Sequence, residues 1–383
     1  MWRQVNTIFR KVIFPSLKDS YIQSKWYSTK GRQPRSTVRI TLISASVGVL
    51  VGAGYGGYTH YKVNTKKSLM PTFEEDYLFL KTAPEYKPQY KIVNDTDTSN
   101  LNLVLFQYTT CPFCCKVRAF LDYHGINYEV VEVDAVLRQA IKWSGYKKVP
   151  ILLAKVDGGY QQLMDSTAII SILSTYLKGG EDAITNILKY YPTNKFVNES
   201  GKEVTDIPNK YFIMHNAAIG DKQKNVEVEE REWREWADNV LVHLLSPNVY
   251  RTPSEALETF KWFEEVGEWK YNFPAWECAV MTYGGAFAMW LISKRLKKRH
   301  NLSDDVRKPL YKAVNDWMKA LAIKGTPFMG GNEPNLADLS VYGVLTSIEG
   351  SQAFKDLREN TKIAKWFDAM KNDIVTKNGK VYL

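Results

Sequence analysis

Two cysteines separated by two residues, Cys111 and Cys114, lie between a short apolar segment and a segment of helical period. The apolar segment, Asn102–Phe106, predicts a strand, and Cys114–His124 predicts a helix. A cysteine where a strand meets a helix faces free backbone amides and the positive end of the helix dipole, which stabilise a thiolate and lower the thiol pKa. Pro112 suits the first helical turn, where its missing amide costs little. This arrangement predicts a reactive Cys111.

The segments after this pair predict a small α/β domain over residues 101–178. They are, in order, a strand, a short helix, a strand with its hairpin partner and a longer helix: Tyr128–Val133, Leu137–Trp143, Ile151–Lys155, Gln161–Met164 and Ser166–Tyr176. With the first strand and helix, this order resembles the thioredoxin-like fold in the form shared by glutaredoxins and the N-terminal domains of glutathione transferases (GSTs).

Apolar residues at helical spacing fill residues 226–383 and predict an all-α domain similar to the C-terminal domain of GSTs. We expect helices over residues 255–265, 275–298, 304–323 and 335–348. Asn335 and Asp338 have the spacing of a capping box at the start of the last of these helices. Residues 179–225, which contain prolines and turn residues, predict an inserted linker or hairpin.

The net charge of +10 is located almost entirely at the N-terminus. Residues 1–39 hold nine Lys and Arg and one acid, Asp19, which leaves a net charge of +2 for the rest of the chain. A nearly neutral body lacks the basic surface that nucleic-acid binding requires, so no nucleic-acid partner is expected. The basic stretch is typical of an organelle-targeting segment or of a basic tail beside a membrane span.

An uncharged run of 19 residues, 40–58, follows the basic stretch. Because a helix needs about 20 residues to cross a bilayer, this run predicts a single transmembrane helix; a buried helix of a soluble domain is the alternative. Residues 59–100 mix prolines, charges and turn residues and predict a tether. We therefore expect a single-pass membrane protein of the Golgi or of mitochondria, which N-terminal processing would release to the cytoplasm.

The number and spacing of the cysteines argue against a disulfide framework and against a zinc site. Four cysteines in 383 residues are too few for a disulfide framework, and no second pair completes a zinc site, so no metal is expected. Cys114, one helical turn inward, would be the resolving thiol in disulfide exchange or a bystander. Cys115 is rotated about 100° from it and is expected to pack, as is Cys278 in its apolar helix.

Two aromatic residues flank Cys111. Tyr108 lies three residues before the cysteine, where its hydroxyl would donate to the thiolate or to a substrate oxygen; the alternative is an aromatic wall of the pocket. Phe113, between Cys111 and Cys114, is expected to form an apolar rim for a lipophilic ligand or to pack against the helical domain.

Val149-Pro150 and Asp165-Ser166 predict a glutathione-binding cradle near Cys111. A proline just before a buried strand in this fold commonly takes the cis isomer, which leaves the Val149 amide and carbonyl free to pair with a cysteinyl residue. The free amides at Ser166 suit a carboxylate, and Asp165 suits an ammonium group, as in a γ-glutamyl end. Ordinary helix capping would also explain Asp165 and Ser166, and it is the order of all three features along the chain that favours glutathione.

Several blocks of sequence within residues 101–355 resemble the membrane-associated prostaglandin E synthase type 2 family. The blocks are Thr110–Cys114, Lys116–Asp122, Lys148–Leu152, Trp236–Asp238, Ser246–Pro253, Leu291–Lys297, Pro327–Gly331 and Pro334–Leu339. The chain departs from the family in its long N-terminal extension and in Cys115 beside Cys114.

The resemblance implies an isomerase that converts prostaglandin H2, a lipid endoperoxide, into prostaglandin E2. It also implies glutathione, haem held through that glutathione, and a homodimer. Carried over to the matching residues, Cys111 is the catalytic cysteine with Tyr108 beside it, while Val149, Asp165 and Ser166 contact glutathione.

Candidates for contact with an anionic lipid or with haem propionates come from the helical domain. They are His243 with Ser246 one turn later, and Arg295 with Arg299 on the same helical face. Structural or solvated side chains are the alternative for each.

Two other functions would use the same residues. A glutathione-dependent thiol–disulfide oxidoreductase of glutaredoxin type would need both Cys111 and Cys114, and a non-catalytic glutathione or haem binder would need neither as a reactant.

Overall fold

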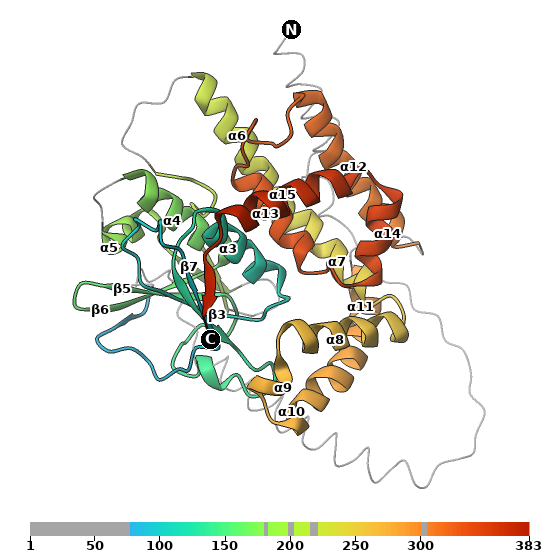
Figure 1. Ribbon diagram of the computed structural model, residues 1–383, viewed down its shortest axis with the longest axis horizontal. Coiled ribbons are helices and arrows are strands. Elements are labelled where there is room, and N and C mark those ends of the chain that lie inside the picture. Colours follow the sequence, from blue (N-terminus) through green and yellow to red (C-terminus); the bar gives the residue numbers. More distant parts are fainter. Residues whose placement is uncertain (1–76, 180–182, 198–202, 215–220, 300–304, 383) are drawn as a thin grey trace. The chain divides into compact units, whose positions relative to one another are not determined.

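The structure, a computed structural model, describes residues 77–179, 183–197, 203–214, 221–299 and 305–382 (Figure 1). The described residues within 73–194 and 205–383 form one compact unit. The predicted targeting segment, residues 1–39, and the predicted membrane span, residues 40–58, lie outside the described residues. Among the helices of the described ranges, none is both long and apolar enough to span a bilayer.

A seven-stranded mixed sheet has the strand order β1-β6-β5-β3-β4-β2-β9. The reactive cysteine, Cys111, follows its central strand β3. The strands are β1 (Phe79–Leu80), β2 (Tyr90–Val93), β3 (Leu103–Gln107), β4 (Tyr128–Glu132), β5 (Ile151–Val156), β6 (Gly159–Met164) and β9 (Lys380–Tyr382). β3 pairs in parallel with β4 and antiparallel with β5, and β5 forms a hairpin with β6. This confirms the thioredoxin-like order predicted from the four central strands.

The sheet is larger than predicted at both edges. The interpretation of residues 59–100 as a tether is wrong for the described part, because β1 pairs with β6 and β2 pairs with β4. The last described residues of the chain add β9 to β2, so part of the predicted helical domain belongs to the sheet. Strands of two to four residues carry too little apolar pattern to be predicted from sequence.

Helices make up most of the remaining described residues. They are α3 (Pro112–Tyr123), α4 (Ser166–Gly179), α5 (Ile184–Ile187), α6 (Asp221–Trp236), α7 (Val242–Val249), α8 (Pro253–Val266), α9 (Trp269–Asn272), α10 (Ala275–Ala279), α11 (Gly285–Arg299), α12 (Arg307–Lys324), α13 (Leu336–Thr346), α14 (Gln352–Asn360) and α15 (Ile363–Lys377). Shorter elements are the 3₁₀ turns η1 (Gln139–Ile141) and η2 (Leu188–Tyr190), the π-helical turns η3 (Ala237–Leu241) and η4 (Val280–Gly284), and a two-stranded sheet of β7 (Asn194–Val197) and β8 (Glu203–Asp206). The helical C-terminal region is confirmed.

One predicted helix is mostly absent. The segment Leu137–Trp143 forms only the 3₁₀ turn η1, because the Asp134 carboxylate accepts hydrogen bonds from three successive amides, those of residues 137, 138 and 139. This turn leaves Arg138 in the left-handed region, with φ of 52°, where an α-helix cannot continue.

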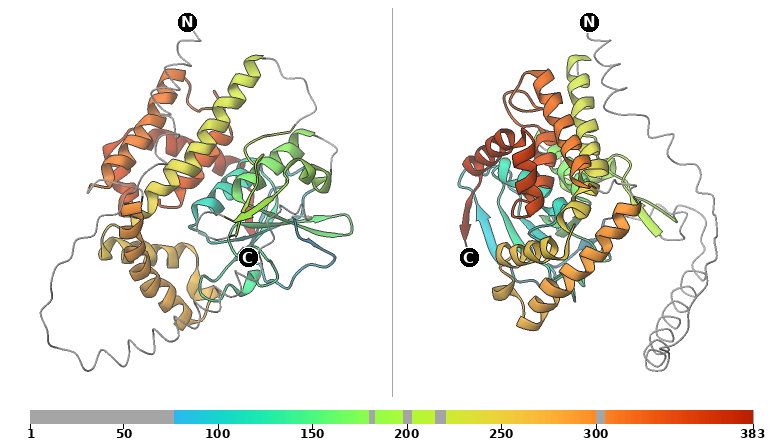
Figure 2. Two further views of the ribbon diagram at one scale, coloured as in Figure 1. Left: turned by 180° about the vertical axis from the view of Figure 1, so that it is seen from behind. Right: turned by 90° about the vertical axis from the view of Figure 1, so that its right-hand side faces the viewer.

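Helix α3, which follows Cys111, lies between the sheet and helices α13 and α15 (Figures 1 and 2). Gly343 on α13 allows this close approach, since a Cβ atom there would lie 2.6 Å from the Cα atom of Lys116. The residues next to the reactive cysteine are therefore held by both the α/β and the helical parts.

Four tryptophans hold the helical domain together. Trp233 and Trp236 on α6, Trp317 on α12 and Trp366 on α15 are buried. The ring centroids of Trp233 and Trp317 are 5.1 Å apart, and those of Trp317 and Trp366 are 5.4 Å apart. Edge-to-face pairs of this kind stabilise a core by about 0.5–1.5 kcal/mol beyond the burial of their area.

The predicted capping box at α13 is confirmed. The Asn335 side chain accepts from the Asp338 amide, and the Asp338 carboxylate accepts from the Asn335 amide. Asp338 is fully buried and also accepts hydrogen bonds from the amides of Met329 and Gly330 and from the indole of Trp366. One carboxylate thus joins the start of α13, the preceding loop and α15.

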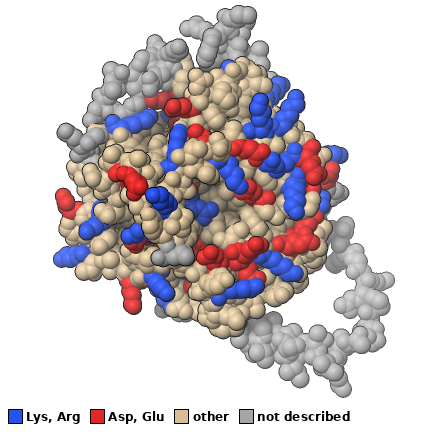
Figure 3. Space-filling model, in the orientation of Figure 1, with Lys and Arg blue, Asp and Glu red and all other residues tan. Residues whose placement is uncertain are grey.

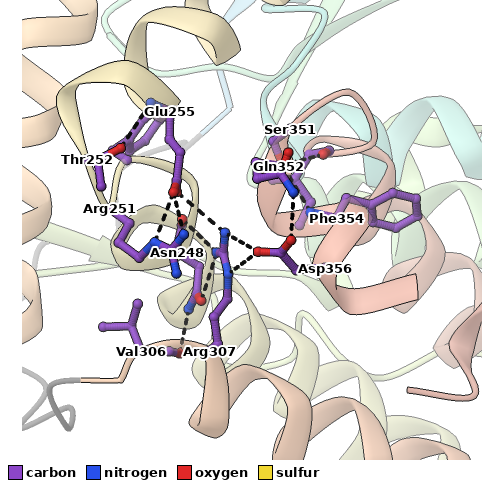
Figure 4. Close-up of polar contacts among 12 residues, drawn as sticks. Asn248, Arg251, Thr252, Glu255, Val306, Arg307, Ser351, Gln352, Phe354 and Asp356 are labelled. Atoms are coloured by element: carbon purple, nitrogen blue, oxygen red, sulfur yellow. Dashed lines mark hydrogen bonds and ion pairs between the residues drawn. The ribbon is translucent and has the colours of Figure 1, made fainter. Parts of the chain in front are cut away.

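A second buried node joins α7, α8, α12 and α14 (Figure 4). The guanidinium of Arg307 donates to the Asp356 carboxylate at 2.8 Å and to the Asn248 carbonyl at 2.8 Å. Its remaining nitrogen lies 3.4 Å from Glu255, which also pairs with Arg251. The rigid guanidinium fork can bind several acceptors at once, which explains why an arginine occupies this position.

Candidate active site

Cys111 is the N-cap residue of α3 and is half-buried with a free thiol. Its amide donates to the Tyr108 carbonyl at 3.0 Å, and its carbonyl accepts from the Cys115 amide at 2.9 Å. Both contacts use backbone atoms, so the Cys111 side chain is positioned without being engaged by them.

Of the three adjacent thiols, Cys111 is the one that ionises most readily. The neighbouring Cys114 thiol, the amides of Cys114 and Phe113 and the charge of Arg118 lower the pKa of Cys111, and burial only partly opposes them. Cys114 is fully buried, and burial together with the neighbouring Cys111 raises its pKa. Burial raises the pKa of Cys115 to about 11. The expectation that Cys115 packs agrees with its buried position.

Three tyrosines surround the thiol within electrostatic range. Burial raises the pKa of Tyr108, Tyr146 and Tyr250, and negative charge on Cys111 raises it further in each case. All three phenols therefore remain protonated at neutral pH. Among the described residues, none accepts a hydrogen bond from the Tyr108 hydroxyl, which leaves it able to donate to a ligand.

The peptide bond between Val149 and Pro150 is cis, as predicted. Val149 is half-buried, and neither its amide nor its carbonyl forms a hydrogen bond with any residue in the described ranges. Both groups therefore remain able to pair with an extended peptide.

Asp165 caps α4 with one carboxylate oxygen and pairs with a lysine through the other. Its Oδ1 atom accepts hydrogen bonds from the amides of Thr167 at 2.9 Å and Ala168 at 3.3 Å, which caps α4. Its Oδ2 atom faces the ammonium of Lys210 at 3.5 Å. Ser166 is 4% exposed, and its hydroxyl has no hydrogen-bond partner among the residues that the structure describes. The start of α4 therefore offers an unengaged hydroxyl beside a charged pair.

Lys210 belongs to the inserted segment and was not predicted as a site residue. Besides Asp165, its ammonium lies 3.7 Å from Asp206. Burial lowers the pKa of Lys210, but the charges of Asp165, Asp206 and Asp238 outweigh this effect and raise it. The inserted segment therefore adds a fixed positive charge to the cradle.

A buried ion pair joins α3 to the helical domain. Lys116 is 1% exposed and pairs with the carboxylate of Asp238 on η3. Lys116 also donates to the Thr167 hydroxyl at 2.8 Å, and Asp238 accepts from the hydroxyls of Thr167 at 2.6 Å and Tyr211 at 3.1 Å. Burial works against a charged Asp238, but Lys116 and these hydrogen bonds lower its pKa.

The ligand candidates on the helices are more exposed than the cradle. Phe113 is 36% exposed and lies 5.7 Å from the Lys116 ammonium, as measured to its ring centroid. His243 and Ser246 lie on α7, where His243 is exposed and Ser246 half-buried. Arg295 and Arg299 are exposed on α11. Within the described ranges, no hydrogen bond or ion pair connects Ser246, Arg295 or Arg299 to Cys111 or Asp165. The roles of these three residues and of His243 stay predictions.

Sequence reasoning missed Lys210, Tyr146 and Tyr250. Tyr250 lies inside one of the family blocks, but nothing in that block indicates that it comes near Cys111. Lys210 and Tyr146 had no sequence signal, since only the folded chain brings them to the site.

Lys and Arg are interspersed with Asp and Glu on the face of the molecule seen in Figure 3, and uncharged residues make up much of the surface between them. The described residues contain no group of three or more His, Cys, Asp and Glu side chains that could hold a metal ion.

Several known proteins are similar to this chain. Residues 103–158 match the glutaredoxin family model. The chain is 48% identical over 324 residues to prostaglandin E synthase 2 of Danio rerio, which covers 84% of this chain and 79% of that protein. It is 51% identical over 280 residues to prostaglandin E synthase 2 of Mus musculus, which covers 72% and 71%. A solved structure of glutaredoxin 2 from Salmonella typhimurium in complex with glutathione is 18% identical and has a TM-score of 0.37, over 71% of this chain and 94% of that one.

The strand order, the cysteine at the start of α3 and the glutaredoxin match over residues 103–158 place the chain in the thioredoxin-like superfamily, here with a helical C-terminal region. Within that superfamily, identities near 50% over most of both chains show that this chain belongs to the prostaglandin E synthase 2 family.

Proposed function

We propose that this protein isomerises prostaglandin H2 to prostaglandin E2, with Cys111 as the catalytic thiol, Tyr108 assisting and glutathione bound beside it. The observation that carries the proposal is the half-buried Cys111 thiol with its lowered pKa at the start of α3, in a chain of this family. The raised pKa of Tyr108 keeps its hydroxyl protonated, and this supports its role as a hydrogen-bond donor to the substrate.

The chemistry is balanced within the substrate. The Cys111 thiolate takes the ring hydrogen beside one peroxide oxygen as a proton, and the electron pair of that C–H bond forms the ketone as the O–O bond breaks. The other oxygen leaves as an alkoxide, which the Tyr108 hydroxyl stabilises and which then receives the proton from the Cys111 thiol. No external oxidant or reductant is consumed.

Glutathione fits the residues that form the cradle. The unpaired amide and carbonyl of Val149 would bind its cysteinyl part, with Pro150 fixing the turn, and the Ser166 hydroxyl would bind its γ-glutamyl carboxylate. When bound, glutathione would supply a second thiol to the site.

Lys210 is expected to contribute to this binding through its charge. Replacing it, as Lys210→Met, should weaken glutathione binding about tenfold, because an ion pair with the γ-glutamyl carboxylate is lost. Calorimetry with glutathione and with 4-aminobutyryl-cysteinyl-glycine, which lacks that carboxylate, separates the interaction from general damage: the analogue should bind both proteins equally. Lys189→Met, on the exposed 3₁₀ turn η2, is the matched control. Tighter glutathione binding by Lys210→Met would show that Lys210 only blocks Asp165.

We also propose that the protein binds haem, is anchored in a membrane and forms a homodimer. Arg295 and Arg299 are exposed and form no ion pair with a described residue, which suits haem propionates, while Phe113, His243 and Ser246 would line the lipid or haem side. A bound haem would bring an iron that reacts with peroxides. Residues 40–58 would anchor the chain in a Golgi or mitochondrial membrane, and fractionation with protease protection tests this placement.

A second candidate is a glutathione-dependent thiol–disulfide oxidoreductase, which the glutaredoxin match over Cys111 and Cys114 favours. Incubating the full chain with prostaglandin H2, with and without glutathione, should give prostaglandin E2 above the spontaneous background. Disulfide reduction that requires Cys114, without prostaglandin E2, would support the oxidoreductase instead. Stoichiometric uptake of haem without turnover of either substrate would indicate a binding protein.

A further inference from the structure

A buried carboxylate lies under the loop that carries Cys111. Glu132, at the end of β4, is 5% exposed. It accepts hydrogen bonds from the amide of Thr109 at 2.7 Å, from the Thr109 hydroxyl at 2.8 Å and from the Gln107 side-chain amide at 3.3 Å. All three donors come from the end of β3 and the loop before Cys111, so Glu132 fastens this loop to the neighbouring strand.

A guanidinium holds the same loop from the side of α3. Arg118 donates to the Thr109 carbonyl at 2.8 Å and to the Gln107 side-chain carbonyl at 2.9 Å. It also contacts the sulfur of Cys115 at 3.3 Å, and the Cys115 thiol in turn lies 3.3 Å from the Thr109 carbonyl. Every polar group of Thr109 is therefore engaged, by Glu132 on one side and by α3 on the other.

The proposed reaction uses none of these five residues (Gln107, Thr109, Cys115, Arg118 and Glu132) directly. Their arrangement nevertheless fixes the position of Cys111. Thr109 lies two positions before Cys111, and the carbonyl of Tyr108, next to Thr109, accepts a hydrogen bond from the Cys111 amide. The charge of Arg118, a half-buried cation held against this loop, also favours a negative charge on the nearby thiol.

We propose that Glu132 and Arg118 are positioning residues for Cys111: together they hold Thr109 in place, and the charge of Arg118 keeps Cys111 reactive at neutral pH. The inference rests on Cys111 as the reacting thiol of the proposed function and not on prostaglandin H2 as substrate. Its test can therefore fail or succeed independently of the isomerase activity.

The test measures how fast iodoacetamide alkylates Cys111 in the full chain as a function of pH, with mass spectrometry of the Cys111 peptide to separate it from the other cysteines. Arg118→Met should slow alkylation at pH 7 about tenfold and move the pH midpoint upward, since one unit of thiol pKa is a tenfold change in thiolate. Arg118→Lys, which keeps the charge, should restore most of the rate even though it cannot reproduce the fork.

The other titratable groups near the thiol remain in place in these variants: Tyr108, Cys114, Cys115, Glu132, Tyr146 and Tyr250. Glu132→Gln keeps an acceptor for the Thr109 amide and removes a negative charge. It should leave the midpoint unchanged or lower it, because burial raises the pKa of Glu132 to about 7 and its charge is partial near neutral pH. Glu129→Gln, three residues earlier on the same strand, is the matched control and should change nothing.

Two results would overturn the proposal. One is an unchanged midpoint in folded Arg118→Met, which would make the network purely structural. The other is a rise in Glu132→Gln as large as that in Arg118→Met, because any disturbance of the network would then suffice and the sign of the charge would have no role.

Discussion

Replacing Cys111 by serine is expected to reduce prostaglandin E2 formation about a hundredfold or more, to the spontaneous background. General acid–base groups contribute about 10²- to 10⁴-fold to a reaction rate, and a serine hydroxyl does not ionise near neutral pH. The fold should survive, because the hydrogen bonds that position residue 111 use its backbone amide and carbonyl. The measurement is the initial rate of prostaglandin E2 formation by the full chain, with thermal unfolding as a check on folding.

Cys278→Ser is the matched control for this experiment. Cys278 is buried, and its sulfur lies 3.3 Å from the Trp269 carbonyl and 3.6 Å from the Phe273 carbonyl, contacts that a serine hydroxyl can make. The control should retain its activity. If Cys111→Ser kept more than about a tenth of the rate, the thiol would not be the group that removes the proton. Another residue of the site would then have to be the base.

The reactive cysteine could be predicted from sequence because its environment is local. A strand, a proline at the first helical turn and a helical period within some twenty residues place Cys111 at the N-cap position of α3. The cis bond before Pro150 could be predicted from its place ahead of β5. The capping box at Asn335 was equally local.

The residues that complete the site could not be predicted, because they come from distant parts of the chain. Lys210 reaches Asp165 from the inserted segment, and Tyr250 comes within electrostatic range of Cys111 from the end of α7. Neither has a pattern in its own neighbourhood that indicates a ligand. The edge strand β9 could not be predicted for a related reason. Its three residues show no periodic pattern, and they become a strand only by pairing with β2.

The largest effect on stability is expected from Asp238→Ala. Removing this carboxylate leaves the ammonium of Lys116 buried with one neutral partner, the Thr167 hydroxyl. Breaking a buried pair in this way typically lowers the free energy of unfolding by about 3–5 kcal/mol. Because Lys116 lies on α3 two residues after Cys114, the same change should disturb the reactive thiol. Thermal unfolding followed by tryptophan fluorescence measures the loss.

Two further variants decide whether the unpaired charge causes that loss. Tyr211→Phe removes one hydrogen bond to Asp238 and leaves the ion pair intact, so it should cost about 1 kcal/mol. The double variant Lys116→Met with Asp238→Leu removes both charges, and it should recover much of the stability lost in Asp238→Ala, because the desolvation of both ions disappears together with their attraction. A double variant as unstable as Asp238→Ala would mean that the hydrogen bonds to Thr167 and Tyr211, rather than the pairing of charge, hold α3 against the helical domain.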